Sequence, residues 1–284
     1  MTLSDGRTSL LASTRDDGDF TREADISELG VFHASHSIEV WFVALATFTI
    51  TTTVSEPESP LSTTLFPFMF AGDDFGTLYT RRFRGFSPSL PSRQHHHDDV
   101  AQQYCSEGEE EEELQVEADY NDRARHHSAG VTSILPLPVP SSLLRDRFGN
   151  APAPLLLTGS YDEYLRVYRV SRAGEVLAEI GLDGGVWRLQ LLEVGRSNEK
   201  DYYLVLASCM HAGTRVVRVS CLYDQEDKGI GGEGSWQIEV VAEFTEHESM
   251  NYASDVWKGS SPSELLCMSS SFYDRRVCLW RVSC

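Results

Sequence analysis

Short apolar runs separated by small and polar residues recur along the chain, and this is the pattern of an all-β protein. The runs are rich in Val, Leu, Tyr, Phe and Thr, and no stretch of helical length repeats its apolar residues with a helical period. Three pairs of runs share one plan, in which an apolar strand ends in small residues, a tight polar turn follows, and a second strand completes the pair. They are LLLTGSYDEYLRVYRV (155–170), LVLASCMHAGTRVVRV (204–219) and LLCMSSSFYDRRVCLWRV (265–282).

Partial copies of this plan extend it towards the N-terminus. FMFAGDDFGTLYTRRF (68–83) is one copy, and TLSDGRTSLL (2–11) is a shorter one. Segments with a His or a Gly pair precede several copies, such as HHSAGVTSI (126–134) and DGGVWRLQLL (183–192). In WD repeats a His-containing turn precedes three strands and an Asp-containing turn joins the middle two, which gives one four-stranded blade. We therefore expect a WD40-type β-propeller with about five blades of an expected seven, in an N-terminally truncated or incomplete ring.

Charge and spacing divide the chain into three expected parts. These are N-terminal blades in residues 1–85, the first of them partial, a disordered acidic insertion in 86–125, and C-terminal blades in 126–284, the last without its outer strand. Residues 98–122 hold eleven acidic residues and no Lys or Arg, so this segment has too little apolar surface to offset the entropy of ordering. The formal net charge of the 284 residues is −19. This balance argues against nucleic-acid binding through a basic face and favours a basic protein partner.

The spacing of the cysteines and the lack of standard motifs restrict the cellular compartment and the classes of catalytic or metal site that we expect. The six cysteines show neither a CxxC pair nor zinc-like spacing, which indicates the reducing cytoplasm. Neither a signal peptide nor a membrane-spanning stretch is found. GxSxG, HExxH, GxGxxG and P-loop motifs are missing, and the His triplet at 95–97 lies in a low-complexity segment. We expect a monomer with no cofactor and no metal.

Two blades carry the polar residues that WD repeats use internally. Such sets satisfy polar groups that are costly to bury unpaired, so we interpret them as structural rather than catalytic. The first set is Asp162 with His127, Thr158 and Tyr168, and the second is Asp274 with His247, Ser270 and Trp280.

The blade at 184–245 breaks this pattern. His211 stands where the other blades keep the turn Asp, and Gly184 and Gly185 stand where they keep the turn His. An imidazole titrates near neutral pH and is suited to moving protons. The turn is expected on the face where loops converge on the central channel. A surface hydrogen-bonding role for His211 is the alternative interpretation.

Other surplus polar and aromatic residues would face the same rim. Paired carboxylates can hold one group at a raised pKa, although a solvated turn explains Asp73 and Asp74 equally well, and core packing is the alternative for the tryptophans. The residues are Asp73, Asp74, His36, Glu39, Trp41, Trp187 and Tyr252.

Several motifs, taken in order, resemble those of one WD-repeat family, the diphthine methyl ester hydrolases of diphthamide biosynthesis, also called diphthine methyltransferases. The motifs are AGDDFG (71–76), LLTGSYDEYLRVY (156–168), GGVWRL (184–189), ASCMHAG (207–213), EHESMNYASDVW (246–257) and SSFYDRRVCLWR (270–281). The resemblance implies a methylesterase that acts on diphthine methyl ester, carried on a modified histidine of translation elongation factor 2. That factor is then the expected partner.

Ester hydrolysis requires a base, an activated nucleophile and donors for the tetrahedral oxyanion. Our assignment places His211 as catalytic base, Asp74 or Glu39 as the group that orients it, and backbone N–H groups near Gly184 and Gly185 or Gly213 as oxyanion donors. Asp73, His36, Trp41, Trp187 and Tyr252 are expected to bind substrate. Two alternatives remain: a non-catalytic WD scaffold with aromatic hot spots, and an adaptor that attracts basic partners through residues 98–122.

Overall fold

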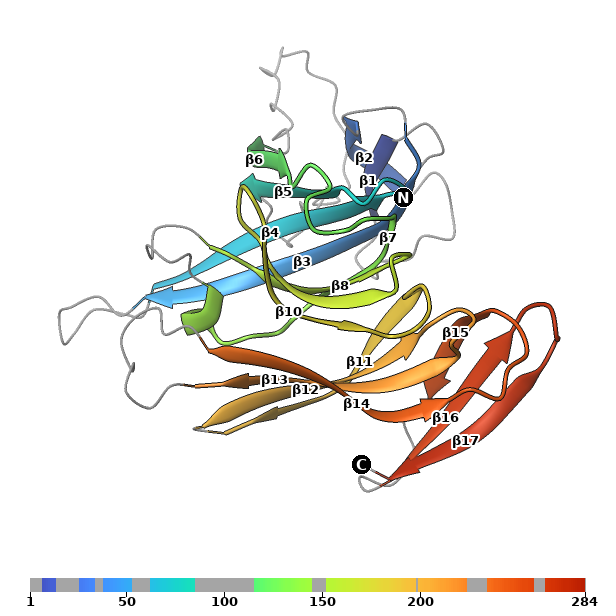
Figure 1. The fold of residues 1–284 in the computed structure, drawn as a ribbon. Coiled ribbons are helices and arrows are strands. Elements are labelled where there is room, and N and C mark those ends of the chain that lie inside the picture. The colour runs from blue at the N-terminus through green and yellow to red at the C-terminus, as the bar shows by residue number, and fades with distance from the viewer. Residues whose placement is uncertain are drawn as a thin grey trace, which may run out of the picture.

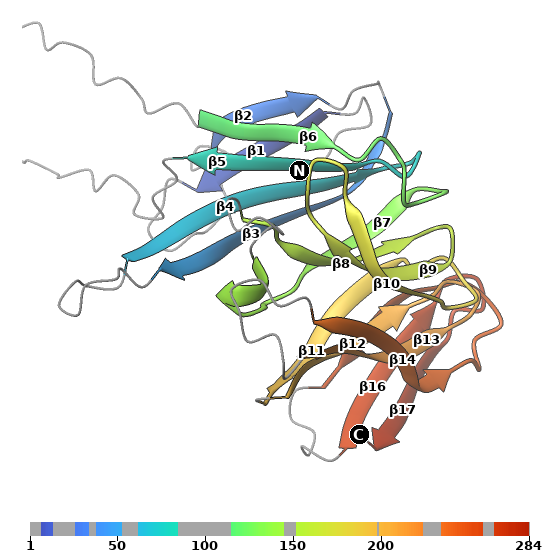
Figure 2. The ribbon, with the colours of Figure 1, turned by 60° about the vertical axis from the view of Figure 1, so that its left-hand side comes forward.

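The computed structural model describes residues 7–13, 26–33, 38–52, 62–84, 115–144, 152–197, 199–223, 234–257 and 264–283. In these residues the chain forms five antiparallel sheets and one short 3-10 helix, η2 (Ser141–Leu144). Each sheet is built from consecutive strands, so the sheets follow one another in chain order from the blue strands to the red ones (Figures 1 and 2).

The strands of each sheet pair in the order in which they occur in the chain. The first sheet contains β1 (Arg7–Ser13) and β2 (Ile26–His33). The second contains β3 (Val40–Thr52), β4 (Ser62–Asp73), β5 (Leu78–Arg84) and β6 (Gln115–Asn121). The third contains β7 (Val131–Pro136), β8 (Leu155–Ser160), β9 (Tyr164–Arg169) and β10 (Glu175–Gly181). The fourth contains β11 (Arg188–Arg196), β12 (Lys200–Ser208), β13 (Thr214–Leu222) and β14 (Ser235–Phe244), and the fifth contains β15 (Asn251–Val256), β16 (Glu264–Ser271) and β17 (Val277–Ser283).

Face-to-face packing of neighbouring sheets explains the apolar runs of the sequence. All six residues of β8 are buried, and Leu155 and Leu157 are fully inaccessible, because this strand lies in a hydrophobic core that the second, third and fourth sheets share. The first strands of successive sheets lie beside one another, β3 beside β7, β7 beside β11 and β11 beside β15. This arrangement confirms the expected all-β, WD40-type propeller architecture.

Glycines at equivalent strand ends allow this close approach. A Cβ atom on Gly72 of β4 would lie 2.6 Å from Val131 Cβ at the start of the next sheet. A Cβ atom on Gly159 of β8 would lie 2.6 Å from Val186 Cγ1, in the segment that leads into the following sheet. The repeated Gly therefore sets the spacing between consecutive blades.

The predicted disordered insertion is wrong for residues 115–125, because β6 occupies Gln115–Asn121 and pairs with β5. Ion pairs across the two strands compensate its acidic side chains: Arg81 Nε lies 3.2 Å from Asp119 Oδ2, and Arg82 Nε lies 3.1 Å from Glu117 Oε2. A count of acidic residues alone missed this because the compensating arginines are more than thirty residues away in the sequence. Residues 85–114, including the His triplet, lie outside the described residues.

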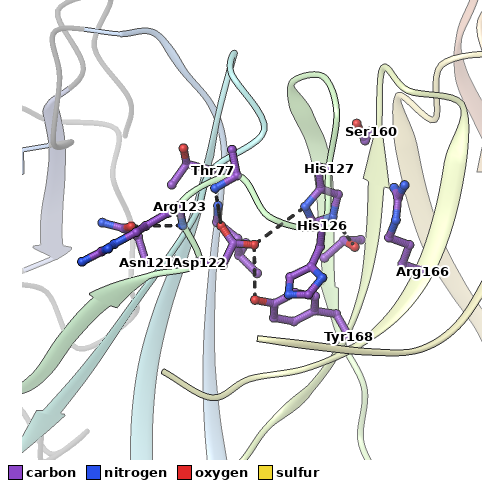
Figure 3. A network of polar contacts seen from close by, with 12 residues as sticks. Thr77, Asn121, Asp122, Arg123, His126, His127, Ser160, Arg166 and Tyr168 are labelled. Carbon is purple, nitrogen blue, oxygen red and sulfur yellow. Dashed lines mark hydrogen bonds and ion pairs between the residues drawn. The ribbon is translucent and has the colours of Figure 1, made fainter. Parts of the chain in front are cut away.

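A buried polar network joins the second and third sheets (Figure 3). His127 Nε2 lies 2.9 Å from Thr158 Oγ1, as predicted. The Tyr168 hydroxyl, however, donates to Asp122 Oδ2 at 3.3 Å, and Asp122 Oδ1 also accepts from the Leu78 amide at 3.0 Å. Asp162 was therefore wrongly placed in this set.

Asp162 instead joins the β8–β9 turn to the segment that precedes β7. Its carboxylate accepts from the Ser128 and Tyr164 amides and from Arg166 Nη1, which lies 2.9 Å away. The arginine four residues along the chain draws the carboxylate to the turn, and this pairing was not anticipated.

The corresponding hydrogen-bonded set in the last sheet differs from the prediction at Ser270 and at Trp280, whose buried Nε1 makes no hydrogen bond with the described residues. His247 Nδ1 lies 3.7 Å from Asp274 Oδ2, but His247 Nε2 lies 2.9 Å from Ser269 Oγ and not from Ser270. Alternate residues of a strand point to opposite faces, so Ser270 faces away from the histidine. Trp280 stacks on Phe244 with a ring-centroid distance of 5.3 Å.

Burial of His127 predicts a pH dependence of stability. Burial, followed by the nearby charge of Arg166, lowers the pKa of His127 from 6.5 to about 3. Between these two values the unfolded chain binds a proton that the folded chain does not, so stability falls as the pH falls from 6.5 towards 3. The limiting slope is ~1.4 kcal/mol per pH unit.

The measurement is urea unfolding at several pH values between 4.5 and 7, with His127→Gln as the comparison. Asp122, whose Oδ2 lies 4.0 Å from His127 Nδ1, has a pKa raised by burial and contributes in the opposite direction. Because Asp122 remains in the variant, the difference between the two slopes isolates the histidine. Equal slopes would contradict a neutral, buried His127.

Candidate functional site

The turns between the second and third strands of the sheets lie beside the segments that enter the first strands. Three equivalent hydrogen bonds make this connection within successive sheets: Asp74 N–H to Glu39 O (3.1 Å), Tyr161 N–H to Gly130 O (2.9 Å) and Phe272 N–H to Met250 O (3.2 Å). Bonds between sheets join the same regions, since Val186 N–H donates to Ser160 O and Asn251 N–H donates to Met210 O, both at 2.9 Å. One end of the molecule therefore collects turns from four sheets.

His211 lies at the tip of the turn between β12 and β13. The turn is rigid because the Cys209 amide donates to Gly213 O at 2.7 Å and the Ala212 amide donates to Cys209 O at 2.9 Å. Arg215 Nη1 donates to the Ala212 carbonyl at 2.5 Å. The side chain of His211 is exposed and makes no hydrogen bond or ion pair with the described residues. It is therefore available to solvent and to a ligand.

The two glycines that precede β11 pack against this turn. A Cβ atom on Gly184 would lie 2.2 Å from Cys209 O, and one on Gly185 would lie 2.6 Å from Met210 Sδ. A side chain at Gly184 would displace the backbone of the His211 turn, and one at Gly185 would displace the side chain of Met210. Gly213 has a φ of +81°, and its amide already donates to Met210 O at 3.2 Å, so its role lies in the turn and we remove it from the candidate oxyanion donors.

Four aromatic rings from three sheets and one intervening segment meet at this end. Trp41 of β3 contacts Tyr161 of the β8–β9 turn, with centroids 5.0 Å apart, and Trp187, with centroids 5.6 Å apart. Tyr161 and Trp187 are 5.8 Å apart, and Trp187 and Tyr252 of β15 are 5.2 Å apart. We call Trp41, Tyr161, Trp187 and Tyr252 the aromatic cluster.

Three members of the aromatic cluster were candidates from the sequence, and Tyr161 was missed. The available signal was its place directly after the strand-ending Ser160, which matches Phe272 after Ser271 in the last sheet. Burial raises the pKa of Tyr161, and the nearby Tyr252 and the Asp74 carboxylate raise it further. The charge of Asp74 is therefore felt at the aromatic cluster.

The paired aspartates have different roles. Asp74 is exposed, whereas Asp73 is 1 % exposed and its carboxylate accepts from the Phe75 and Thr77 amides and from the Tyr79 hydroxyl. Asp73 thus holds the β4–β5 turn together, and its assignment to substrate binding is withdrawn. Among the described residues, no hydrogen bond or ion pair joins His211 to Asp74 or Glu39. His36 lies outside the described residues.

Side-chain nucleophiles beside His211 are buried. Burial raises the pKa of the Cys209 thiol to about 12, so this group is protonated at neutral pH. The Ser208 hydroxyl is buried and bonded to Ser254 Oγ at 3.0 Å. Neither side chain is therefore exposed as a nucleophile beside His211. In the described part of the chain, no three His, Cys, Asp or Glu side chains are placed to hold a metal ion, and no helix has the length and apolarity of a membrane span.

Comparison with known proteins identifies relatives, although no family model matches the chain. A protein named diphthine methyltransferase from Schizosaccharomyces pombe is 36% identical over 155 residues, which are 55% of this chain and 38% of that protein. Proteins of the same name match from Mus musculus, at 36% identity over 63 residues (22% of this chain, 12% of that protein), and from Homo sapiens, at 27% over 132 residues (46% and 23%). The resemblance inferred from the motifs is confirmed. The chain spans less than half the length of the relatives it matches.

Proposed function

We propose that the chain carries the catalytic face of a methylesterase that hydrolyses diphthine methyl ester on translation elongation factor 2 to give diphthine. The similarity to proteins named diphthine methyltransferase supports a role in diphthamide biosynthesis. The observation that carries the reaction type is the exposed His211 on a turn that Gly184 and Gly185 buttress. The setting proposed is a cytoplasmic monomer without a cofactor.

The proposed chemistry is general-base hydrolysis. His211 removes a proton from a water molecule as the water oxygen attacks the ester carbonyl carbon, which forms a tetrahedral oxyanion. Collapse of this intermediate breaks the bond to the methoxy group, which leaves as methanol after it takes the proton from the imidazolium. The products are methanol and a carboxylic acid, which releases its proton to solvent and becomes a carboxylate.

Groups at the same end of the molecule as His211 supply two further roles, which are orientation of the base and stabilisation of the oxyanion. Asp74 or Glu39, both exposed, would orient His211 in the complex with substrate, and the amides of Gly184 and Gly185 would donate to the oxyanion. Catalytic hydrogen bonds often tighten only in the complex, so the absence of a His211–carboxylate bond among the described residues is compatible with this role.

The direct test is incubation with elongation factor 2 that carries diphthine methyl ester. We expect the modified peptide to lose the mass of one CH₂ group and methanol to appear in equal amount, as measured by mass spectrometry and a methanol assay. An unchanged peptide mass at a stoichiometric concentration of the folded chain would contradict the proposal.

A non-catalytic scaffold is the second candidate function. Phe272 and Tyr273 of the β16–β17 turn are 69 % and 71 % exposed, as hot-spot aromatics of a docking face would be. A scaffold would bind the factor equally well with and without the methyl ester and would release no methanol. The same incubation, combined with a binding measurement, therefore distinguishes the two functions.

A further inference from the structure

A cavity of about 460 Å³ lies between the end of β6, with the loop that follows it, and the turn that joins β9 to β10. Its volume falls within the range of small-molecule sites, roughly 300–1,000 Å³. Three arginines line it, Arg123, Arg125 and Arg172, and the Asp119 carboxylate is the acidic group among the lining residues. No residue of the aromatic cluster lines this cavity, so it is separate from the candidate catalytic site.

The three arginines are not paired with acidic residues in the described part of the chain. Each is exposed and forms no ion pair with a described carboxylate. The Asp119 carboxylate lies 3.2 Å from Nε of Arg81 on the neighbouring strand, so its charge is already compensated. Because the whole chain has a formal charge of −19, a cavity lined by three such cations is a local reversal of sign, and it favours an anion as ligand.

Direct contacts hold together the two segments that carry these arginines. His126, in the loop after β6, donates from Nε2 to the Ala173 carbonyl in the β9–β10 turn at 3.1 Å. The same imidazole ring contacts the Tyr168 ring, with centroids 5.5 Å apart. Gly174, at the end of the turn, has a φ of +71°, and a Cβ atom there would collide with the Tyr168 hydroxyl. The two walls of the cavity are therefore positioned before any ligand binds.

The backbone of the first wall adopts a rare conformation. Arg123 and Ala124 have φ values of +56° and +51°, a region that residues with side chains seldom occupy. Two side chains stabilise it, because Asn121 Oδ1 accepts from the Arg123 amide at 3.2 Å and Asp122 Oδ1 accepts from the Ala124 amide at 3.1 Å (Figure 3). Backbone strain of this kind is concentrated at functional sites. Here it fixes the point at which the Arg123 side chain leaves the backbone.

We propose that this cavity, lined by Arg123, Arg125 and Arg172, is a binding site for a phosphate group. A phosphate monoester carries a charge of about −1.5 to −2 at pH 7 and offers three acceptor oxygens. A guanidinium donates two parallel N–H bonds to such oxygens, so three arginines match one phosphate better than one carboxylate, which has a single charge and two oxygens. The Tyr120 hydroxyl, which lines the same cavity, is a further donor.

The first experiment titrates the full chain with inorganic phosphate at neutral pH and constant ionic strength, followed by ³¹P NMR, with acetate as competitor. We expect acetate to displace phosphate only at a concentration at least ~5-fold higher, because it carries less charge and fewer acceptors. The affinity for phosphate should also fall as salt is added, since the cavity is open to solvent. Displacement by an equal concentration of acetate, or no binding of phosphate at millimolar concentration, would overturn the proposal.

Variants locate the binding. Arg125→Gln and Arg172→Gln are each expected to weaken phosphate binding ~5-fold or more, through the loss of charge-assisted hydrogen bonds. Both positions are exposed, so the variants should fold. Arg275→Gln is the matched control, because Arg275 is an exposed arginine of the β16–β17 turn in the fifth sheet and its replacement removes the same charge. Native affinity in both cavity variants, or an equal loss in the control, would contradict the proposed site.

A phosphoserine peptide identifies the source of the phosphate group. Tighter binding of the peptide than of inorganic phosphate would assign the site to a phosphorylated protein, and equal or weaker binding would assign it to a free phosphate compound. The unphosphorylated peptide is the control, and binding as tight as that of the phosphorylated form would rule out recognition of phosphate. These measurements use no ester substrate, so their outcome does not depend on the proposed methylesterase activity.

Discussion

His211→Ala is expected to reduce methylesterase turnover on elongation factor 2 by a factor of about 10²–10⁴, the usual contribution of a general base. The loss should lie in kcat, because the imidazole acts on water rather than on the bulk of the protein substrate. Stability should change little, since the side chain is exposed and unpaired among the described residues. Methanol release under single-turnover conditions, with thermal unfolding as a check on the fold, gives the measurement.

His126→Ala is the matched control for this experiment. His126 lies in the loop between β6 and β7, and its Nε2 is 3.1 Å from the Ala173 carbonyl, away from the aromatic cluster. Removal of its imidazole should leave turnover unchanged. Full turnover by His211→Ala would remove the catalytic assignment and leave the exposed histidine as a surface residue.

Asp73→Ala is expected to destabilise the fold by about 3 kcal/mol. The carboxylate is buried and accepts two backbone amides and one phenol hydroxyl, so its removal leaves several donors unsatisfied. Urea unfolding monitored by tryptophan fluorescence measures the loss. A change below ~0.5 kcal/mol, the usual range for surface substitutions, would show that the turn does not depend on this carboxylate.

Asp74→Ala is the natural comparison because the two residues are adjacent. Asp74 is exposed, so its replacement should change stability by no more than ~0.5 kcal/mol. Turnover should respond in the opposite order, with the larger effect at Asp74. Stability and turnover, compared between the two variants, distinguish a carboxylate that forms the turn from one that is available to a ligand.

The strand pairs of the blades were predictable where both strands were apolar and close to each other in the sequence. β8 and β9, or β12 and β13, follow directly from LLLTGSYDEYLRV and LVLASCMHAGTRVVRV. β6 was not predictable in this way, because Glu117 and Asp119 read as part of an acidic segment until Arg81 and Arg82 are placed opposite them. Ion pairs between residues that are distant in the sequence join β6 to β5.

The sequence pointed to several residues of the candidate site, but it did not show which other residues they contact. The break in the repeat pointed to His211, and the starts of the inner strands pointed to Trp41 and Trp187. Tyr161 was missed because its contacts come from sheets distant in sequence. Asp73 and Asp74 could not be separated, since only the turn geometry determines which carboxylate faces inward.

The four rings of the aromatic cluster come from separate segments of the chain. Tyr161 belongs to the third sheet, whereas Tyr252 belongs to the fifth, and their backbones are held by ladders that do not involve the rings. Replacement of one ring therefore removes its contacts to the neighbouring rings but leaves the strand pairing of the sheets in place. The rings at this end can therefore change from one chain to another while the blades that carry them stay the same.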